Sequence, residues 1–313
     1  MASAITLHQL ASIPYAVLAP ERAGPLPLCI LLLGAGGRRE NLIDLQPVFE
    51  GWWREGILPP MIVAVPSPGM DYYLQWDAFL ADELIPAVRA NFGASGVTIL
   101  AGISGGGYGA LKLAFARPEM FAAIAAMQPM LEPGLRESDV GERNRLHHAA
   151  GGPPQLIGPA RDAALWEANN PANRARANAQ AIRESDMAIY IDAAGRDFLN
   201  AHDGAEFLHR TLWGLDLAHE YHLVRDADHG GPSLRPRMRA MFAWLGAVLG
   251  PPAADQQAEE AAAEWLQSGM KGKPPAGATT TNAFVEFTRA RFEPQRKKAG
   301  EGDPAANRRY GVI

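Results

Sequence analysis

One turn between a predicted strand and a predicted helix constrains this chain more than any other feature. Residues 97–101 are short, apolar and rich in β-branched side chains, which predicts a buried strand, and residues 110–116 predict a helix. Between them stands Gly-Ile-Ser-Gly-Gly at 102–106, a Gly-x-Ser-x-Gly motif that continues into Gly107. A serine in this strand–turn–helix context is typical of an exposed nucleophile, so Ser104 is the candidate nucleophile.

This interpretation explains why glycines surround Ser104. A nucleophile at the tip of so sharp a turn adopts a strained backbone conformation, and its neighbours must be small for strand and helix to pass closely. Gly102, Gly105, Gly106 and Gly107 supply that smallness. The alternative is an ordinary glycine-rich turn with an incidental serine. We favour the nucleophile because the motif occurs in the context that its chemistry requires.

Apolar runs alternate with helical patterns as far as about residue 250. Strands are predicted at 15–19, 28–33, 61–65, 97–101, 122–127, 187–191 and 220–224. Helices are predicted at 77–91, 110–116 and 238–249, with one more between the last two strands. This order predicts an α/β protein with a doubly wound, mostly parallel sheet covered by helices.

Two stretches depart from the alternation and set the expected domain organisation. Residues 129–183 are long, polar and poor in strand signals, so they form either a cap or pocket wall over the active site or a structureless insertion. After Gly250 the composition changes to an Ala/Glu-rich predicted helix at 253–267 and then to a Lys/Gly/Pro linker. We therefore expect a catalytic domain at 1–250 and a C-terminal helical or extended appendage at 251–313.

The appendage carries an apolar cluster, formed by Phe284, Val285, Phe287 and Phe292. Such a cluster is too apolar to lie free in water, and the linker lets it reach a remote surface. We expect it to dock on its own catalytic domain or on a second subunit, which would make a homo-oligomer. The alternative is a disordered tail, which the basic, glycine-containing residues 297–302 favour.

Composition narrows the function class. The net charge of −5 gives no indication of a nucleic-acid partner. The single cysteine, Cys29, lies in an apolar run, excludes an intrachain disulfide and is expected to be a small buried hydrophobe. No signal-peptide pattern opens the chain and no apolar run reaches membrane-spanning length, so the cytoplasm is the default expectation and no membrane partner is expected.

A serine nucleophile needs a base, and His229 is the candidate. It lies in the loop that directly follows the apolar strand ending at Val224, whereas His222 lies inside that strand. Histidine is the base that works near neutral pH, usually oriented by a carboxylate. The eight histidines could instead suggest a metal site, but no pair has an HExxH or similar spacing beside an acidic partner. We expect neither a metal nor a cofactor.

The carboxylate should follow the penultimate strand, which offers Asp192 and Asp197. Asp197 stands in the loop beyond the strand end, where it is free to turn toward His229. Asp192 stands at the strand terminus and is expected to stay in the sheet. Asp228 is adjacent to His229 in the chain, and neighbouring side chains on extended backbone point apart, so it is a poor orienter of the ring. We favour Asp197.

An acyl-transfer site also needs two N–H groups directed at the developing negative charge. One is expected from Gly105, the residue after the nucleophile, and the other from the glycine-rich loop 34–37 after the second predicted strand. Within that loop we choose Ala35, with Gly36 as the second choice. The alternative for the loop is a simple turn.

These segments together resemble the putative-esterase group of α/β-hydrolases, which includes esterase D or S-formylglutathione hydrolase, feruloyl esterases and mycolyltransferase-like proteins. The resemblance covers about residues 12–249. It rests on an opening strand Ile-Pro-Tyr-Ala-Val, a Leu-Leu-Leu-Gly-Ala-Gly-Gly segment, a helix with Glu-Leu-Ile-Pro, the elbow from Gly102 to Ala110, and the acid loop Tyr-Ile-Asp with Gly195 and Asp197. The chain departs from the family pattern in three places, with Leu33 for a histidine, Gly105 for a methionine and Gly230-Gly231-Pro232 for a tryptophan.

The resemblance implies an α/β-hydrolase fold for about residues 12–249, to which the cap insertion and the C-terminal extension inferred above from composition are added. Together with the motifs it predicts a serine esterase that hydrolyses a small-molecule carboxylic ester through an acyl-enzyme intermediate. Two alternatives stay open: an acyltransferase, in which an alcohol or thiol replaces water, and a catalytically silent α/β-hydrolase that serves as a binding protein. Neither the acyl group nor the alcohol can be read from the sequence.

Overall fold

The computed structural model describes residues 2–22, 24–69, 73–144, 162–250, 256–288 and 290–291. The chain divides into two compact units, Met1–Gly250 and Pro251–Ile313. Within the described ranges, no helix combines the length and the apolar character that crossing a bilayer requires.

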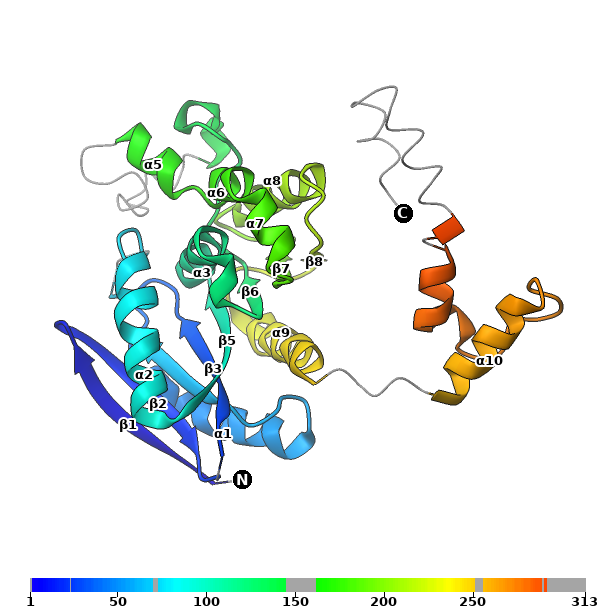
Figure 1. The fold of residues 1–313 in the computed structure, drawn as a ribbon. Coiled ribbons are helices and arrows are strands. Elements are labelled where there is room, and N and C mark those ends of the chain that lie inside the picture. Colours follow the sequence, from blue (N-terminus) through cyan, green and yellow to red (C-terminus); the bar gives the residue numbers. More distant parts are fainter. Residues whose placement is uncertain are drawn as a thin grey trace. The chain divides into compact units, whose positions relative to one another are not determined.

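An eight-stranded sheet forms the centre of the first unit, in the order β1-β2-β4-β3-β5-β6-β7-β8 (Figure 1). The strands are β1 (Ser3–Leu10), β2 (Ile13–Pro20), β3 (Leu26–Leu32), β4 (Ile62–Pro66), β5 (Ala94–Ile103), β6 (Ala123–Met127), β7 (Ala188–Ala194) and β8 (Glu220–Val224). The β1–β2 and β2–β4 pairs are antiparallel and all later pairs are parallel. The predicted α/β class with a mostly parallel sheet is confirmed. The edge strand β1 was not predicted.

Helices cover both faces of the sheet (Figure 1). One face packs against α1 (Asn41–Glu55) and α9 (Leu234–Leu249). The other packs against a π-helix at Phe79–Leu84 that continues as α2 (Ile85–Phe92), and against α3 (Gly105–Ala116) and α8 (Ala201–Gly214). The side chains of β3 alternate between the two cores, with Ile30 in one and Cys29 and Leu31 in the other. A continuous apolar run is therefore needed, as in any strand buried on both faces.

The strand order reverses between β3 and β5. From β3 the chain passes through α1 on one face, whereas from β5 it passes through α3 on the opposite face. The loops that leave the two neighbouring strands therefore diverge at the carboxyl edge of the sheet. Such a switch point is where open α/β sheets bind their ligands. The loop 33–37 and the turn at Ser104 lie at this point.

The polar segment 129–183 is largely helical from residue 137 on, in the part that the structure describes. It contains a 3₁₀ turn at Glu137–Asp139 and the helices α5 (Ala163–Asn169), α6 (Pro171–Ala177) and α7 (Ala179–Glu184). Asp162 and Asn170 begin α5 and α6 by accepting backbone N–H groups of the first turn. The alternative of a structureless insertion is therefore wrong for the helical part, while residues 145–161 lie outside the described ranges.

The second unit contains α10 (Gln256–Gln267), a 3₁₀ turn at Ala278–Thr280 and helical residues 282–288. The helix predicted at 253–267 is thus present from residue 256, and residues 253–255 lie outside the description.

Two contacts hold this second unit together. The Glu259 carboxylate accepts the backbone N–H groups of Asn282 and Ala283 at 2.7 and 3.0 Å, which caps the helix that starts there. The Trp265 and Phe284 rings stack with centroids 6.3 Å apart. Phe284 thus has an aromatic partner within its own unit. Docking of this unit on another surface stays a prediction, and Phe292 and residues 297–302 lie outside the described ranges.

Candidate active site

Ser104 occupies the tip of the turn between β5 and α3, in a strained conformation with φ 58° and ψ −122°. The glycines on either side make this turn sterically feasible. A Cβ atom on Gly102 would lie 2.2 Å from the carbonyl oxygen of Gly106, and one on Gly106 would lie 2.0 Å from that of Leu32. Strand and helix thus pass at a distance that only glycine allows, as the motif predicted.

A continuous hydrogen-bond chain joins the ends of three parallel strands. Ser104 follows β5, Asp197 follows β7 and His229 follows β8, so all three lie at the carboxyl edge of the sheet. The His229 Nε2 atom is 2.9 Å from the Ser104 hydroxyl, and its Nδ1 atom is 2.7 Å from an Asp197 carboxylate oxygen. The imidazole is 12% exposed and the Asp197 side chain is fully buried. This is the arrangement in which a histidine can take a proton from a serine.

Asp192, the other carboxylate considered, is occupied elsewhere. Its side chain is buried and accepts hydrogen bonds from the Arg237 guanidinium, with Nε 2.9 Å from one carboxylate oxygen. Burial raises the pKa of Asp192, and the hydrogen bonds from Arg237 oppose that rise. The structure therefore brings Asp197, and not Asp192, to His229.

The buried Asp192–Arg237 pair supports the loop that carries His229. Arg237 Nη1 donates to the carbonyl oxygen of Asp228 at 3.1 Å and to the side-chain oxygen of Gln128 at 2.6 Å. The Gln128 amide in turn donates to the carbonyl oxygen of His229. The carbonyl groups of Asp228 and His229, two consecutive residues of the histidine loop, are thus fixed by hydrogen bonds from Arg237 and Gln128.

Asp228 connects the histidine loop to the acid loop. Its Oδ1 atom accepts the backbone N–H of His229 at 2.7 Å and that of Phe198 at 3.0 Å. These two hydrogen bonds lower the pKa of Asp228 below its usual range. Asp228 does not bind the imidazole, as expected, but it ties together the two loops whose separation sets the Asp197–His229 distance.

Sequence reasoning did not identify Gln128, Arg237 or this role of Asp228. Gln128 directly follows β6 and has a positive φ of 41°, and Arg237 is one of several arginines at the start of α9. Only the burial of Arg237, which is 4% exposed, distinguishes it from the exposed arginines around it. Burial of that kind is decided by packing, so no local signal could have found it.

The loop after β3 lies against Ser104, as the oxyanion-hole prediction requires. A Cβ atom on Gly34 would lie 3.0 Å from Ser104 Cβ and 3.5 Å from its hydroxyl oxygen. The Gly36 N–H is already bonded to the carbonyl of Gly69 at 2.6 Å, which favours Ala35 over Gly36 as a donor. Gly105 is the first residue of α3, so its N–H has no carbonyl of a preceding helical turn to bond.

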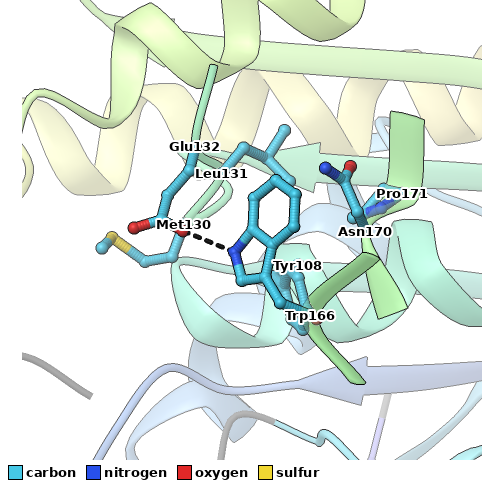
Figure 2. A pocket seen from close by; sticks show the side chains of 7 residues that line it. All are labelled: Tyr108, Met130, Leu131, Glu132, Trp166, Asn170 and Pro171. Atoms are coloured by element: carbon cyan, nitrogen blue, oxygen red, sulfur yellow. Dashed lines mark hydrogen bonds between the residues drawn. The ribbon is translucent and has the colours of Figure 1, made fainter. Parts of the chain in front are cut away.

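A pocket lies one helical turn along α3 from Ser104. Figure 2 shows its lining, in which the Trp166 indole donates to Glu132 at 2.7 Å. The seven lining residues are Tyr108, Met130, Leu131, Glu132, Trp166, Asn170 and Pro171. The Met130 N–H donates to the Ser104 carbonyl at 3.1 Å, which connects the pocket wall directly to the nucleophile turn. The segment 129–183 thus supplies most of the wall of this pocket.

A buried ionic cluster attaches the same segment to the elbow helix. The Lys112 ammonium, which is fully buried on α3, lies 2.9 Å from the Asp77 carboxylate. Arg174 of α6 binds the same carboxylate at 2.5 Å and also donates to the Lys112 carbonyl. The Tyr108 hydroxyl adds a hydrogen bond to the Asn169 carbonyl at 3.0 Å. These contacts fix α6 and the pocket relative to Ser104.

Among the described residues, no three His, Cys, Asp or Glu side chains gather as a metal site would require. Cys29 is fully buried in β3, and burial raises the pKa of its thiol, so it is held as the neutral form.

Comparison with known proteins adds a family and a fold. The family model described as Putative esterase matches residues 17–245. The chain has no significant sequence match among curated proteins.

Solved structures of esterases superpose on most of the chain. A ferulic acid esterase has 17% identity and a TM-score of 0.62, covering 79% of this chain and 99% of that chain. An S-formylglutathione hydrolase from Agrobacterium tumefaciens has 18% identity and a TM-score of 0.60, with 79% and 95% covered. The fluorophosphonate-binding serine hydrolase F of Staphylococcus aureus has 18% identity and a TM-score of 0.59, with 78% and 98% covered. At this level of identity the likeness shows the fold, which is that of α/β-hydrolases.

Proposed function

The chain belongs to the putative esterase family, and we propose that it is a serine hydrolase that cleaves small carboxylic esters through a Ser104–His229–Asp197 triad. The family match confirms the resemblance seen in the sequence. The observation that carries the proposal is the chain of two hydrogen bonds, 2.9 and 2.7 Å long, from Ser104 through His229 to Asp197.

The first half of the reaction forms an acyl-enzyme. The Ser104 oxygen attacks the ester carbonyl carbon while its proton passes to Nε2 of His229. The carbonyl oxygen becomes an oxyanion, which the N–H groups of Ala35 and Gly105 stabilise. The bond from the carbonyl carbon to the alcohol oxygen then breaks, and His229 gives its proton to that oxygen. The alcohol leaves, and the acyl group stays on Ser104.

The second half releases the acid. A water molecule gives a proton to His229 and attacks the acyl carbon, and the bond to the Ser104 oxygen breaks as His229 returns the proton to it. Throughout, the Asp197 carboxylate holds the ring in the tautomer that leaves Nε2 free to accept, and it stabilises the imidazolium. Because Asp197 is fully buried and Asp228 fixes the two loops, this orientation does not depend on the substrate.

A fluorophosphonate probe and a set of simple esters test the proposal. Wild-type protein should be labelled at Ser104 and should hydrolyse short-chain esters, as the fluorophosphonate-binding neighbour suggests. Ser104→Ala should abolish labelling and lower turnover by several orders of magnitude, up to about 10⁶-fold, without changing the fold. Ser268→Ala, at an exposed serine of the second unit, is the matched control and should change neither. Unlabelled and inactive wild-type protein would contradict the proposal.

Product analysis separates hydrolysis from acyl transfer. With methanol added to the assay, the free acid should remain the main product at low methanol concentration. Preferential formation of the methyl ester would instead identify an acyltransferase on the same site.

A further inference from the structure

Phe198 stands directly beside the triad with its side chain in solvent. It is 70% exposed, the largest exposed fraction among the large apolar side chains of the described ranges. Its ring lies edge-on to the His229 imidazole, with centroids 5.9 Å apart and an interplanar angle of 72°. Leaving a phenylalanine in water forgoes the favourable burial of its whole ring. An exposed aromatic in contact with a catalytic ring therefore calls for an explanation other than packing.

Hydrogen bonds hold the backbone that carries this side chain. The Phe198 N–H donates to Asp228, and the next residue, Leu199, donates its N–H to the Asp197 carboxylate at 2.8 Å. The charged groups of the two loops satisfy one another, since Arg196 pairs with Asp226 at 2.9 Å. The phenyl ring is thus an exposed apolar surface on a hydrogen-bonded backbone, bordered by polar groups, which is the composition of a ligand-binding contact.

The proposed chemistry determines which part of an ester this surface can meet. His229 must protonate the alcohol oxygen as the ester bond breaks, so the alcohol part of the substrate lies next to the imidazole during acylation. The acyl part is the other substituent on the carbonyl carbon attacked by Ser104, and the oxyanion donors on α3 and the loop after β3 bind only the carbonyl oxygen. A side chain that packs on the imidazole from the acid loop is therefore on the alcohol side of the reacting carbon.

We propose that Phe198 is a specificity-determining residue that binds the alcohol part of the ester, and that the enzyme prefers esters of bulky apolar or aromatic alcohols. The inference rests on the proposed function and deepens it. In the free enzyme the ring is exposed, and in the complex the leaving group covers it. The contact exists during acylation only, because the alcohol has departed before water attacks the acyl-enzyme.

Two series of esters test the assignment. The first keeps the acyl group as acetate and varies the alcohol through methanol, butanol and benzyl alcohol. The second keeps methanol and varies the acyl group through acetate, butyrate and phenylacetate. Phe198→Ala should lower kcat/KM about tenfold for benzyl acetate and less than about twofold across the methyl series. Phe198→Tyr should retain the preference for benzyl acetate, because the aromatic ring remains.

Deacylation provides an internal control, since every acetate ester passes through the same acetyl-enzyme. Its rate should be equal in wild type and Phe198→Ala. Trp213→Ala is the matched surface variant: this ring is 41% exposed and lies edge-on to His209, with centroids 5.8 Å apart, on helix α8. It should leave both ester series unchanged.

The outcomes separate this inference from the proposed function. An equal loss by Phe198→Ala on all esters, with slower fluorophosphonate labelling, would show that Phe198 acts only through His229 and would overturn the assignment. A loss of kcat/KM whose size depends on the acyl group rather than on the alcohol would overturn it as well. Wild-type protein that neither labels nor turns over would refute the proposed function itself, and the inference with it.

Discussion

Asp192 and Asp197 stand five residues apart at the end of β7, and each carboxylate binds one basic side chain. The Asp192–Arg237 pair lies inside the protein, with side chains 1% and 4% exposed. The Asp197–His229 pair lies at the carboxyl edge of the sheet, where the imidazole reaches the surface and Ser104. One pair is closed off from any substrate, and the other has one member that faces the nucleophile.

The difference shows that the two pairs have separate roles: Asp192–Arg237 supports the backbone of the histidine loop, and Asp197–His229 orients the imidazole toward Ser104. Arginine stays protonated and offers several fixed donors, so it is suited to hold backbone carbonyls permanently. Histidine can exchange a proton near neutral pH, so it is suited to general base catalysis. The buried pair fixes the backbone of Asp228 and His229 through Arg237 and Gln128. We therefore expect a substitution in the Asp197–His229 pair to lower turnover, and one in the Asp192–Arg237 pair to lower the free energy of unfolding.

The largest effect is expected for Asp197→Asn. A neutral amide no longer favours the required histidine tautomer or stabilises the imidazolium, so kcat should fall by about 10⁴-fold. The side chain is nearly isosteric, so the thermal midpoint should change little. Steady-state kinetics and thermal unfolding on the same sample check both statements. A modest loss of turnover would remove Asp197 from the triad.

Asp192→Asn should act on stability instead. It leaves the buried Arg237 charge without its counter-ion, and breaking a buried pair of this kind costs about 3–5 kcal/mol of unfolding free energy. Turnover of the protein that stays folded at low temperature should fall by less than about tenfold.

Arg239→Met is the control for this experiment, because Arg239 lies on the same helix and its pair with Glu55 is exposed at 3.5 Å. It should change the free energy of unfolding by about 0–1 kcal/mol. Urea unfolding measures both variants. If Asp192→Asn loses turnover like Asp197→Asn while keeping its stability, the contrast between the pairs is wrong.

Asp228→Ala tests the connection between the two loops. Without its carboxylate the N–H groups of Phe198 and His229 lose their shared acceptor, and the distance from Asp197 to His229 is no longer fixed. We expect kcat to fall by about tenfold with the pH profile retained, since both triad partners remain. Asp228→Asn, which keeps one oxygen acceptor, should recover most of the activity. No rescue by asparagine would argue against this positioning role.

The smallest effect is expected on the pH dependence of stability, and it concerns His209 and His219, whose rings contact each other directly. Nδ1 of His209 and Nε2 of His219 are 2.8 Å apart, and burial lowers the pKa of both rings. The unfolded chain takes up protons near the ordinary value of 6.5 while the folded protein resists, so unfolding free energy should decrease as the pH falls below about 6.5. Glu206 favours protonation of His209 and Arg210 opposes it.

Urea unfolding between pH 7.5 and 5.5 measures this dependence. His209→Gln should make it shallower, whereas His222→Gln, at an exposed position of β8, should leave it unchanged. Equal slopes in wild type and His209→Gln would show that the pair does not couple folding to pH.

Much of the first unit was predictable because its strands are buried on both faces. Apolar runs predicted β2 to β7, and the glycines of the elbow predicted the close crossing that the Gly102 and Gly106 contacts show. The last strand, β8, was also predicted, although it is a mostly exposed edge strand. The half-exposed edge strand β1 lacks such a run. Helix α1 was also not predicted: it contains Pro47, and its stability comes from Trp52, Trp53 and Phe49 packing on the sheet. The predicted helix 77–91 begins as a π-helix, a local detail that periodicity does not resolve.

By itself the sequence determined the fold class, the glycine-rich strand–turn–helix at Ser104 and the order of Ser104, Asp197 and His229 along the chain. These features depend on short sequence patterns whose physical cause is local. One example is the glycine that is needed where the backbones of a strand and a helix pass closely. Only the tertiary structure decided which carboxylate reaches His229, that Arg237 is buried beneath the histidine loop, and that Phe198 stands exposed beside the imidazole. Those facts depend on contacts between residues far apart in the chain, where burial and distance are set by how strands and loops pack together rather than by any local pattern.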